Sequence, residues 1–210
     1  MVLERVIYMP PKPKFTKEEI IAVALELVSE KGMEALTARE LGARLGSSAR
    51  PIFTVFNSME EVQQDVRAAA LKRFESYAEK AMHYTPVFKQ VGMQMILFAM
   101  EEPKLYQLVY MSDNSGAIDF EGILDRLGDV ARLCVDVIQR DYGLSQNDAK
   151  TLFEHVWIYT FGIGALCATG MCRFSREEII RMLGQDFMAM LSFTKSGRIN
   201  MPTPVPQMEG

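Results

Sequence analysis

Arginine and hydroxyl side chains gather in residues 37–56, TARELGARLGSSARPIFTVF. The guanidinium of Arg50 can donate two hydrogen bonds to the O6 and N7 atoms of guanine, and serine or threonine hydroxyls can serve a base or a phosphate. Thr37 and Arg39 stand at the expected start of a helix, where unpaired backbone amides favour an anion. These residue types could therefore contact a nucleic acid, and the candidate residues of this stretch are Thr37, Arg39, Ser47, Ser48, Ala49, Arg50, Phe53 and Thr54.

The same stretch predicts a short helix, a tight turn and a second short helix that would position these side chains. Thr37 and Glu40 have the spacing of a capping box, and Gly46 stands where a left-handed glycine would end the first helix. Ser48 is a suitable N-cap for the second helix, and Pro51 falls in its first turn. Its inward stripe would be Ile52, Val55 and Phe56. This pattern is typical of a helix-turn-helix, although a plain helical hairpin would share it.

Capping signals predict helices on both sides of this motif. Thr16 with Glu19 opens one that ends at Gly32, so residues 15–60 form a three-helix unit. Ser58 and Glu61 also have the spacing of a capping box, and they open a long fourth helix that continues to Ala81 without an internal Gly or Pro. We expect this helix to join the unit to a second helical domain.

Residues 61–195 continue with helical patterns. One predicted helix starts at Thr85-Pro86 and ends before Pro103, a short one covers 104–111, and a long one covers 119–142. Ser145 with Asp148 caps the next helix, which ends near Gly170, and Ser175 with Glu178 caps the last. Residues 1–14 read as a flexible basic arm and residues 196–210 as a flexible tail. Because no stretch is a convincing strand, the predicted fold class is all-α.

Composition limits where such a chain could act. The formal net charge is −4, so any contact with nucleic acid must be local, and three cysteines in apolar helical stretches suggest reduced thiols. The acidic Glu4 and the lack of a long apolar run near the N-terminus predict no signal peptide. The longest apolar run, residues 157–171, is shorter than the roughly 20 residues that span a bilayer. We therefore expect a cytoplasmic protein without a membrane partner.

Catalytic patterns are weak. The two histidines, His83 and His155, belong to no metal-binding motif, and Glu154 points to a different helix face from His155. Cys167 and Cys172 do not have the C-x-x-C spacing of a redox pair. We therefore predict no catalytic residue, metal ligand or cofactor, and keep an all-α ligand-binding or redox enzyme with an incidental helix-turn-helix as the alternative.

Residues 15–62 resemble the N-terminal DNA-binding domain of TetR/AcrR-type repressors. The resemblance rests on IIAVALELVSEKGMEALTARELGARLG, on SSARPIFTVFNSMEEV and on the order of the helices, and FAMEEPKLYQLVYM resembles a segment of the family's ligand domains. It implies a repressor that binds a palindromic operator as a homodimer and responds to a small-molecule effector. Three residues depart from the family: Phe53 replaces the usual Tyr, Met59 replaces a phosphate-binding Lys, and Pro51 removes a backbone donor.

The resemblance also implies that the second domain carries both the dimer interface and the ligand pocket. The family pairs its last two helices, here residues 147–169 and 176–193, across the dimer, and Gly162, Gly164, Ala165 and Ala168 would allow close approach. Fifteen methionines suggest an adaptable binding surface, so we expect a largely apolar ligand. The candidate pocket residues are Met82, Phe88, Met95, Phe98, Tyr106, Tyr110, Phe120, Leu124 and Trp157.

Overall fold

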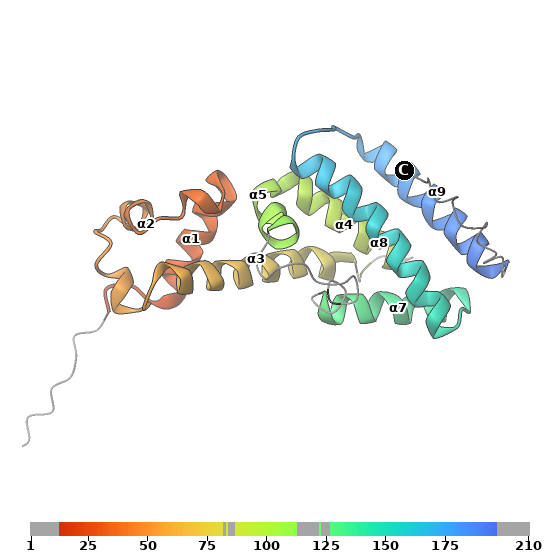
Figure 1. The fold of residues 1–210 in the computed structure, drawn as a ribbon, viewed down its shortest axis with the longest axis horizontal. Helices are drawn as coiled ribbons and strands as arrows, with labels where there is room; N and C mark the ends of the chain where they lie inside the picture. Colours follow the sequence, from red (N-terminus) through yellow and green to blue (C-terminus); the bar gives the residue numbers. More distant parts are fainter. Residues whose placement is uncertain (1–12, 82, 84–86, 113–121, 123–126, 197–210) are drawn as a thin grey trace, which may run out of the picture. The chain divides into compact units, whose positions relative to one another are not determined.

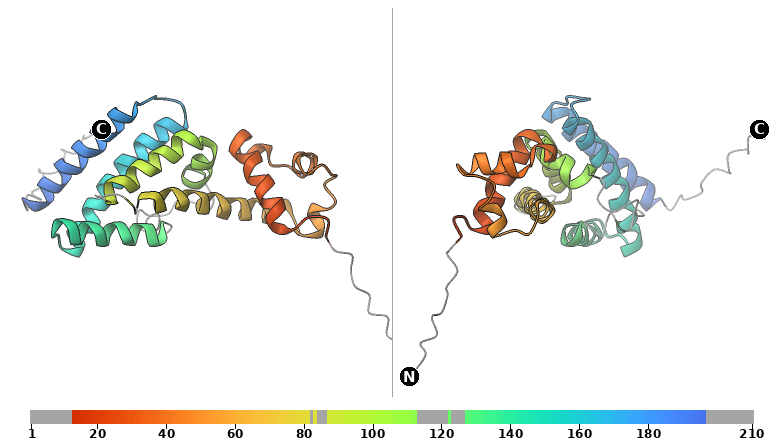
Figure 2. Two further views of the ribbon diagram at one scale, coloured as in Figure 1. Left: turned by 180° about the vertical axis from the view of Figure 1, so that it is seen from behind. Right: turned by 60° about the vertical axis from the view of Figure 1, so that its left-hand side comes forward.

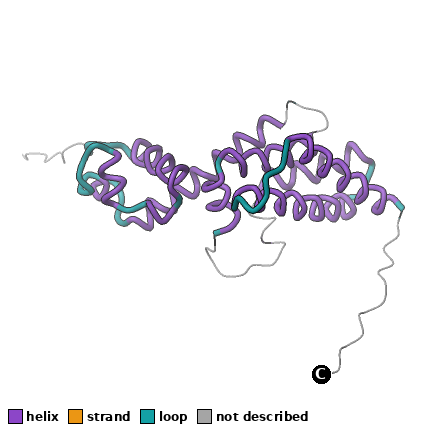
Figure 3. The backbone as a smooth tube through the Cα atoms, turned by 90° about the horizontal axis from the view of Figure 1, so that it is seen from above, coloured by secondary structure: helices purple, strands orange, loops and turns teal. Residues whose placement is uncertain are grey.

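A computed structural model describes residues 13–81, 83, 87–112, 122 and 127–196. Every regular element within these ranges is a helix, which confirms the predicted all-α fold class (Figure 3). None of these helices is long and apolar enough to cross a membrane. The chain forms two compact units, one of residues up to Arg73 together with Glu102–Ser112, and one of Phe74–Glu101 together with the described residues from 122 onward.

The first unit is built around α1, which packs against α2, α5 and a short 3-10 turn. A complete capping box starts α1, since Thr16 Oγ1 accepts from the Glu19 amide at 3.2 Å and Glu19 Oε2 accepts from the Thr16 amide at 2.8 Å. Its buried stripe recurs at helical spacing and ends at Val28. The elements of this unit are α1 (Lys17–Lys31), η1 (Met33–Ala35), α2 (Ala38–Arg44), η2 (Ile52–Thr54), the first part of α3 (Met59–Ala81), α5 (Pro103–Tyr106) and the π-helical η3 (Gln107–Met111).

Two of the predicted capping boxes form only in part. The Thr37 hydroxyl accepts from the Glu40 amide at 3.2 Å, but the Glu40 carboxylate turns to Lys31, at 2.7 Å, and does not close the box. The Ser58 hydroxyl accepts from the Glu61 amide at 3.4 Å, while the Glu61 carboxylate binds the backbone amide of Asn57. In each case the glutamate carboxylate binds another partner, Lys31 or Asn57, and not the backbone amide of the capping residue.

The second helix of the motif is shorter than predicted. Residues 49–51 form a turn, and only Ile52–Thr54 are helical, as a single 3-10 turn in which the Thr54 amide donates to the Pro51 carbonyl at 3.2 Å. Ile52 and Phe56 are buried as expected, but Val55 is only half-buried. Pro51 itself is compatible with the first turn of a helix, since an amide there would have no intrahelical partner, so it does not explain why the helix is short.

The buried carboxylate of Glu102 binds residues of α1 and α3 and so holds the 102–112 segment in the first unit. Glu102 is 8% exposed; it accepts a hydrogen bond from Ser29 Oγ at 2.6 Å and pairs with Arg73 at 2.5 Å. Arg73 also pairs with Glu26 at 2.9 Å. Because these groups belong to α1, α3 and the start of the 102–112 segment, the network joins three parts of the unit that lie far apart in sequence.

The second unit is a layered bundle. Helix α8 lies beside α4 and packs on α7, and α9 packs on both α4 and α8 (Figures 1 and 2). Besides the last part of α3, its helices are α4 (Val87–Glu101), α7 (Gly128–Tyr142), α8 (Gln146–Ala168) and α9 (Arg176–Lys195). Ser145 caps α8, and Ser175 forms a full capping box with Glu178 on α9, as predicted.

Several predicted boundaries can be compared with these helices. α4 ends at Glu101, before Pro103, and the predicted helix at 104–111 is helical from Pro103 to Met111. α7 ends at Gly143, which has the left-handed φ of +65°. The predicted start at Thr85-Pro86, residues 119–121 and 123–126 of the predicted long helix, most of the arm and nearly all of the tail lie outside the described residues.

Candidate nucleic-acid interface and ligand cavity

The eight candidate DNA-binding residues lie at or near the surface of the helix-turn-helix. Ser47 and Ala49 are half-buried, and the other six are exposed: Thr37, Arg39, Ser48, Arg50, Phe53 and Thr54. The alternation within the second element turns Ile52 and Phe56 inward and leaves Arg50 and Phe53 outward, the latter 46% exposed. The Thr54 hydroxyl donates to the Pro51 carbonyl at 2.7 Å, which stabilises the turn that holds these side chains.

Gly42 determines how closely α2 approaches the turn, and it was not among the predicted site residues. A Cβ atom at this position would lie 2.9 Å from the Ala49 nitrogen and 2.9 Å from the Ser48 carbonyl carbon. The Ser47 amide donates to the Gly42 carbonyl at 2.9 Å across the same contact. Since both neighbours are backbone atoms, only glycine fits. The signal in the sequence was a glycine inside a helix rich in good helix formers.

The cations of this unit fall into two groups. Arg44 forms a bidentate ion pair with Glu30, in which Nη1 donates to Oε1 at 2.9 Å. Because the guanidinium donates to it, the pKa of the Glu30 carboxyl is lowered. Arg39 and Arg50, in contrast, are exposed and form no ion pair with any residue that the structure describes. Two arginines therefore remain available to an external anion or base.

Lys14 adds a third positive charge beside the turn. Its Nζ donates to Ser47 Oγ at 3.1 Å and lies 5.1 Å from the centre of the Phe15 ring. The described end of the basic arm therefore contacts the motif itself. This contact concentrates positive charge locally, although the chain as a whole carries a net charge of −4.

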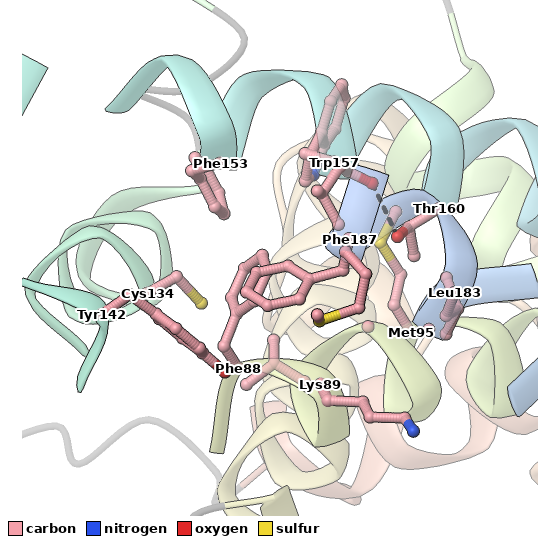
Figure 4. A pocket seen from close by; sticks show the side chains of 15 residues that line it. Phe88, Lys89, Met95, Cys134, Tyr142, Phe153, Trp157, Thr160, Leu183 and Phe187 are labelled. Carbon is pink, nitrogen blue, oxygen red and sulfur yellow. Dashed lines mark hydrogen bonds between the residues drawn. The ribbon is translucent and has the colours of Figure 1, made fainter. Parts of the chain in front are cut away.

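The second unit contains a largely apolar cavity with a volume of about 210 Å³, between α4, α7, α8 and α9 (Figure 4). The rings of Phe88 and Phe187 lie at its centre, 5.6 Å apart, and Trp157 stacks on Phe161 at 5.5 Å. Cys134, Tyr142 and Phe153 line one end, and Lys89 and Leu183 line the other. An engineered apolar cavity of about 150 Å³ binds benzene, so this one has room for a small ligand.

Three of the nine predicted pocket residues line this cavity: Phe88, Met95 and Trp157. Phe98 is buried elsewhere in the second unit, where its ring lies 5.6 Å from Phe74 and 5.2 Å from Tyr77. Tyr106 and Tyr110 contact one another at 4.9 Å within the first unit. The remaining predicted residues, Met82, Phe120 and Leu124, lie outside the described residues.

Besides Lys89, the cavity lining carries the polar groups of Thr160, Cys134 and Tyr142, which have little capacity for acid–base chemistry. The Thr160 hydroxyl donates to the Val156 carbonyl at 2.7 Å within α8. Burial raises the pKa of the Cys134 thiol to about 12, and burial followed by the nearby Asp141 charge raises the pKa of Tyr142. Both groups therefore stay neutral at physiological pH. Their position suits the binding of an apolar group more than the activation of a nucleophile.

Comparisons with known proteins concern the sequence of the first unit and the fold of the chain. Residues 20–66 match the family model described as bacterial regulatory proteins, tetR family. No curated protein matches the chain in sequence. The fold is similar to that of a TetR-like transcriptional regulator from Rhodococcus sp. RHA1, with a TM-score of 0.57, 10% identity, and coverage of 86% of this chain and 96% of that one. It is also similar to the fatty acid degradation regulator FadR from Bacillus halodurans, with a TM-score of 0.53, 12% identity, and coverage of 88% and 96%.

Proposed function

Because residues 20–66 place this chain in the TetR family, as a DNA-binding transcriptional regulator, we propose that it is a repressor that binds a palindromic operator as a homodimer. A small and largely apolar ligand in the cavity of the second unit would release the DNA. The observation that carries the proposal is that Arg39 and Arg50 are exposed on a helix-turn-helix whose other side is buried, and that neither forms an ion pair with a described residue. Such a regulator would act in the cytoplasm.

The two arginines have different roles in this proposal. Arg50 precedes the short 3-10 turn and would read a guanine in the major groove, with Phe53 and Thr54 beside it. Arg39, next to the Thr37-capped start of α2, would bind a phosphate. Lys14 and the serines of the turn would add contacts to the backbone of the DNA.

Exposed apolar side chains on α8 and α9 support the proposed homodimer. Ile158 is 52% exposed and Met188 is 58% exposed, and Ile180 and Phe193 lie on the surface of α9. A Cβ at Gly162 would meet no atom within 4 Å, so a second helix can approach α8 closely there. A two-fold pair would place two motifs on half-sites about one helical turn apart, or a multiple of it.

DNA selection from a random pool, followed by fluorescence anisotropy with the full-length protein, tests the proposal. Arg50→Ala should cost about 1–3 kcal/mol at the base pair that it reads and relax the preference there. Arg39→Ala should weaken binding to all sequences alike and reduce the slope of log K against log salt by about 0.9 per lost phosphate contact.

Arg132→Ala is the matched control, since this arginine is exposed in the second unit and its ion pair within the described residues is with the exposed Asp129. It should bind DNA like the wild type. If the Arg50 and Arg39 variants also did so, the placement of the interface would be wrong. A protein that sediments as a monomer at micromolar concentration while binding DNA normally would contradict the homodimer.

A further inference from the structure

The apolar cavity is adjoined by a smaller and more polar pocket. This second pocket has a volume of about 110 Å³ and lies between α4 and α9. Lys89 and Leu183 line both pockets. The polar pocket adds Gln90 and Arg176, so two cations and an amide gather at one end of an otherwise apolar site.

These two cations are available to a ligand. Lys89 and Arg176 are exposed, and neither forms an ion pair with any residue in the described part of the chain. Gly184 leaves the space beside Lys89 open, because a Cβ there would meet only Lys89 Nζ, at 3.8 Å. Figure 4 shows the amine of Lys89 directed away from the aromatic rings, on the same side of the cavity as Leu183.

The other end of the cavity has the opposite character. Cys134 is 2% exposed and Phe153 is 4% exposed, and both belong to the buried core where α7 meets α8. The lining between the two ends is mainly aromatic and aliphatic. A ligand that matches the whole site therefore needs an apolar body at one end and a negative charge at the other.

We propose that the effector is an apolar monocarboxylate, whose hydrocarbon body occupies the cavity and whose carboxylate binds Lys89 and Arg176. Arginine binds carboxylates through two parallel hydrogen bonds, and lysine adds a point charge. Gln90 can donate a further hydrogen bond through its amide. This inference rests on the proposed function, since it names the chemical class of the ligand that would release the DNA.

Trp157 provides a direct measurement, because it is the only tryptophan of the chain and it lines the cavity. The full-length protein is titrated with octanoate, decanoate and dodecanoate without DNA while tryptophan fluorescence is followed, and decanol is the uncharged comparison. We expect affinity to rise about fourfold per added methylene until the cavity is full. Decanoate should bind at least tenfold more tightly than decanol.

Variants separate the two ends of the site. Lys89→Gln and Arg176→Gln should each weaken decanoate about tenfold or more while leaving decanol unchanged. Lys195→Gln, a lysine at the far end of α9, is the control and should change neither. Gly184→Leu should weaken both ligands by filling the space at the cavity entrance, with an unchanged helical circular dichroism spectrum.

Equal binding of decanoate and decanol, or full decanoate affinity in both charge variants, would overturn the carboxylate assignment. Absence of binding in both fluorescence and calorimetry would overturn the site itself. The DNA measurements are independent of these results. Intact operator binding without decanoate binding rejects only this inference, whereas decanoate binding without any DNA binding rejects the proposed regulator.

Discussion

Gly42 and Gly184 show how differently the two units are packed. Gly42 lies against backbone atoms of Ser48 and Ala49, 2.9 Å from where its Cβ would stand, whereas a Cβ at Gly184 would meet only the end of a lysine at 3.8 Å. The first unit also holds its helices with ion pairs, including Lys17–Asp65 at 2.7 Å and the Arg73–Glu102 contact. The second unit encloses a cavity of about 210 Å³.

The difference matches the tasks that we assign to the units. A surface that reads DNA needs side chains held in one arrangement, and close backbone packing with polar contacts provides that rigidity. A ligand site needs unfilled volume, although a cavity lowers stability because its lining atoms lose packing contacts. A protein that carries out both tasks can place the two kinds of packing in separate units.

The largest expected effect on stability comes from replacing each of these two glycines with alanine. Gly42→Ala should destabilise the protein by about 1–3 kcal/mol, because the added methyl group forces backbone atoms apart. Gly184→Ala should stabilise it by up to about 1 kcal/mol, since alanine favours a helix and has room there. Urea unfolding followed by circular dichroism measures both. If the two substitutions had the same sign, the contrast in packing would be wrong.

The next effect concerns the buried carboxylate of the first unit. Glu102→Gln should cost about 1–3 kcal/mol, because the buried side chain loses the charge with which it binds the half-buried Arg73. Asp129→Asn is the control in the second unit: it breaks the exposed pair with Arg132 and should change stability by less than about 1 kcal/mol. Thermal unfolding of the two variants compares a buried and an exposed ion pair, and equal losses would argue against a special role of Glu102.

The smallest effect is a difference in acid sensitivity. The pKa values of Glu30 and Glu40 are lowered by hydrogen bonds to Arg44 and Lys31, so their stabilising contribution is present at neutral pH and is lost as pH falls below about 4. Burial raises the pKa of Asp186 in α9, so the folded state takes up a proton more readily there and gains stability as pH falls.

Hydrogen exchange at neutral and acidic pH can measure the acid sensitivity of each unit separately. Protection of amides in α1 and α2 should decrease more than protection in α8 and α9 as the pH is lowered. High salt at neutral pH should weaken the same exposed pairs and reduce the difference. A uniform loss of protection across both units would contradict the assignment of acid sensitivity to the glutamates of the first unit.

Local signals in the sequence were enough for much of the fold. Thr16, Ser145 and Ser175 cap their helices as predicted, because a capping interaction depends on only a few neighbouring residues. The predicted capping box of Thr37 and Glu40 forms only in part, because the Glu40 carboxylate binds Lys31, which lies outside the local capping pattern. The motif's second helix was predicted too long, because the capping signal at Ser48 says nothing about where a helix ends, and only Ile52–Thr54 are helical, as a 3-10 turn.

The cavity could be predicted only in part. Phe88, Met95 and Trp157, which line it, were among the candidates because large apolar and methionine side chains favour an adaptable apolar site. Cys134 and Tyr142 were not, because nothing in the sequence of α7 shows which neighbours it will face. The position of Lys89 beside Leu183 likewise depends on how α9 packs on α4. Side chains contributed by separate helices need the tertiary fold.

The hydrogen bond from Ser29 to Glu102, which joins residues 73 positions apart, has a consequence for synthesis on the ribosome. Helices α1, α2 and the first part of α3 emerge long before Leu105 and Tyr106, which are fully buried in the same unit. The nascent helix-turn-helix would therefore lack part of its core until translation passes Ser112. At about 5–20 residues per second, that delay lasts several seconds, during which exposed apolar surface on α1 can attract chaperones.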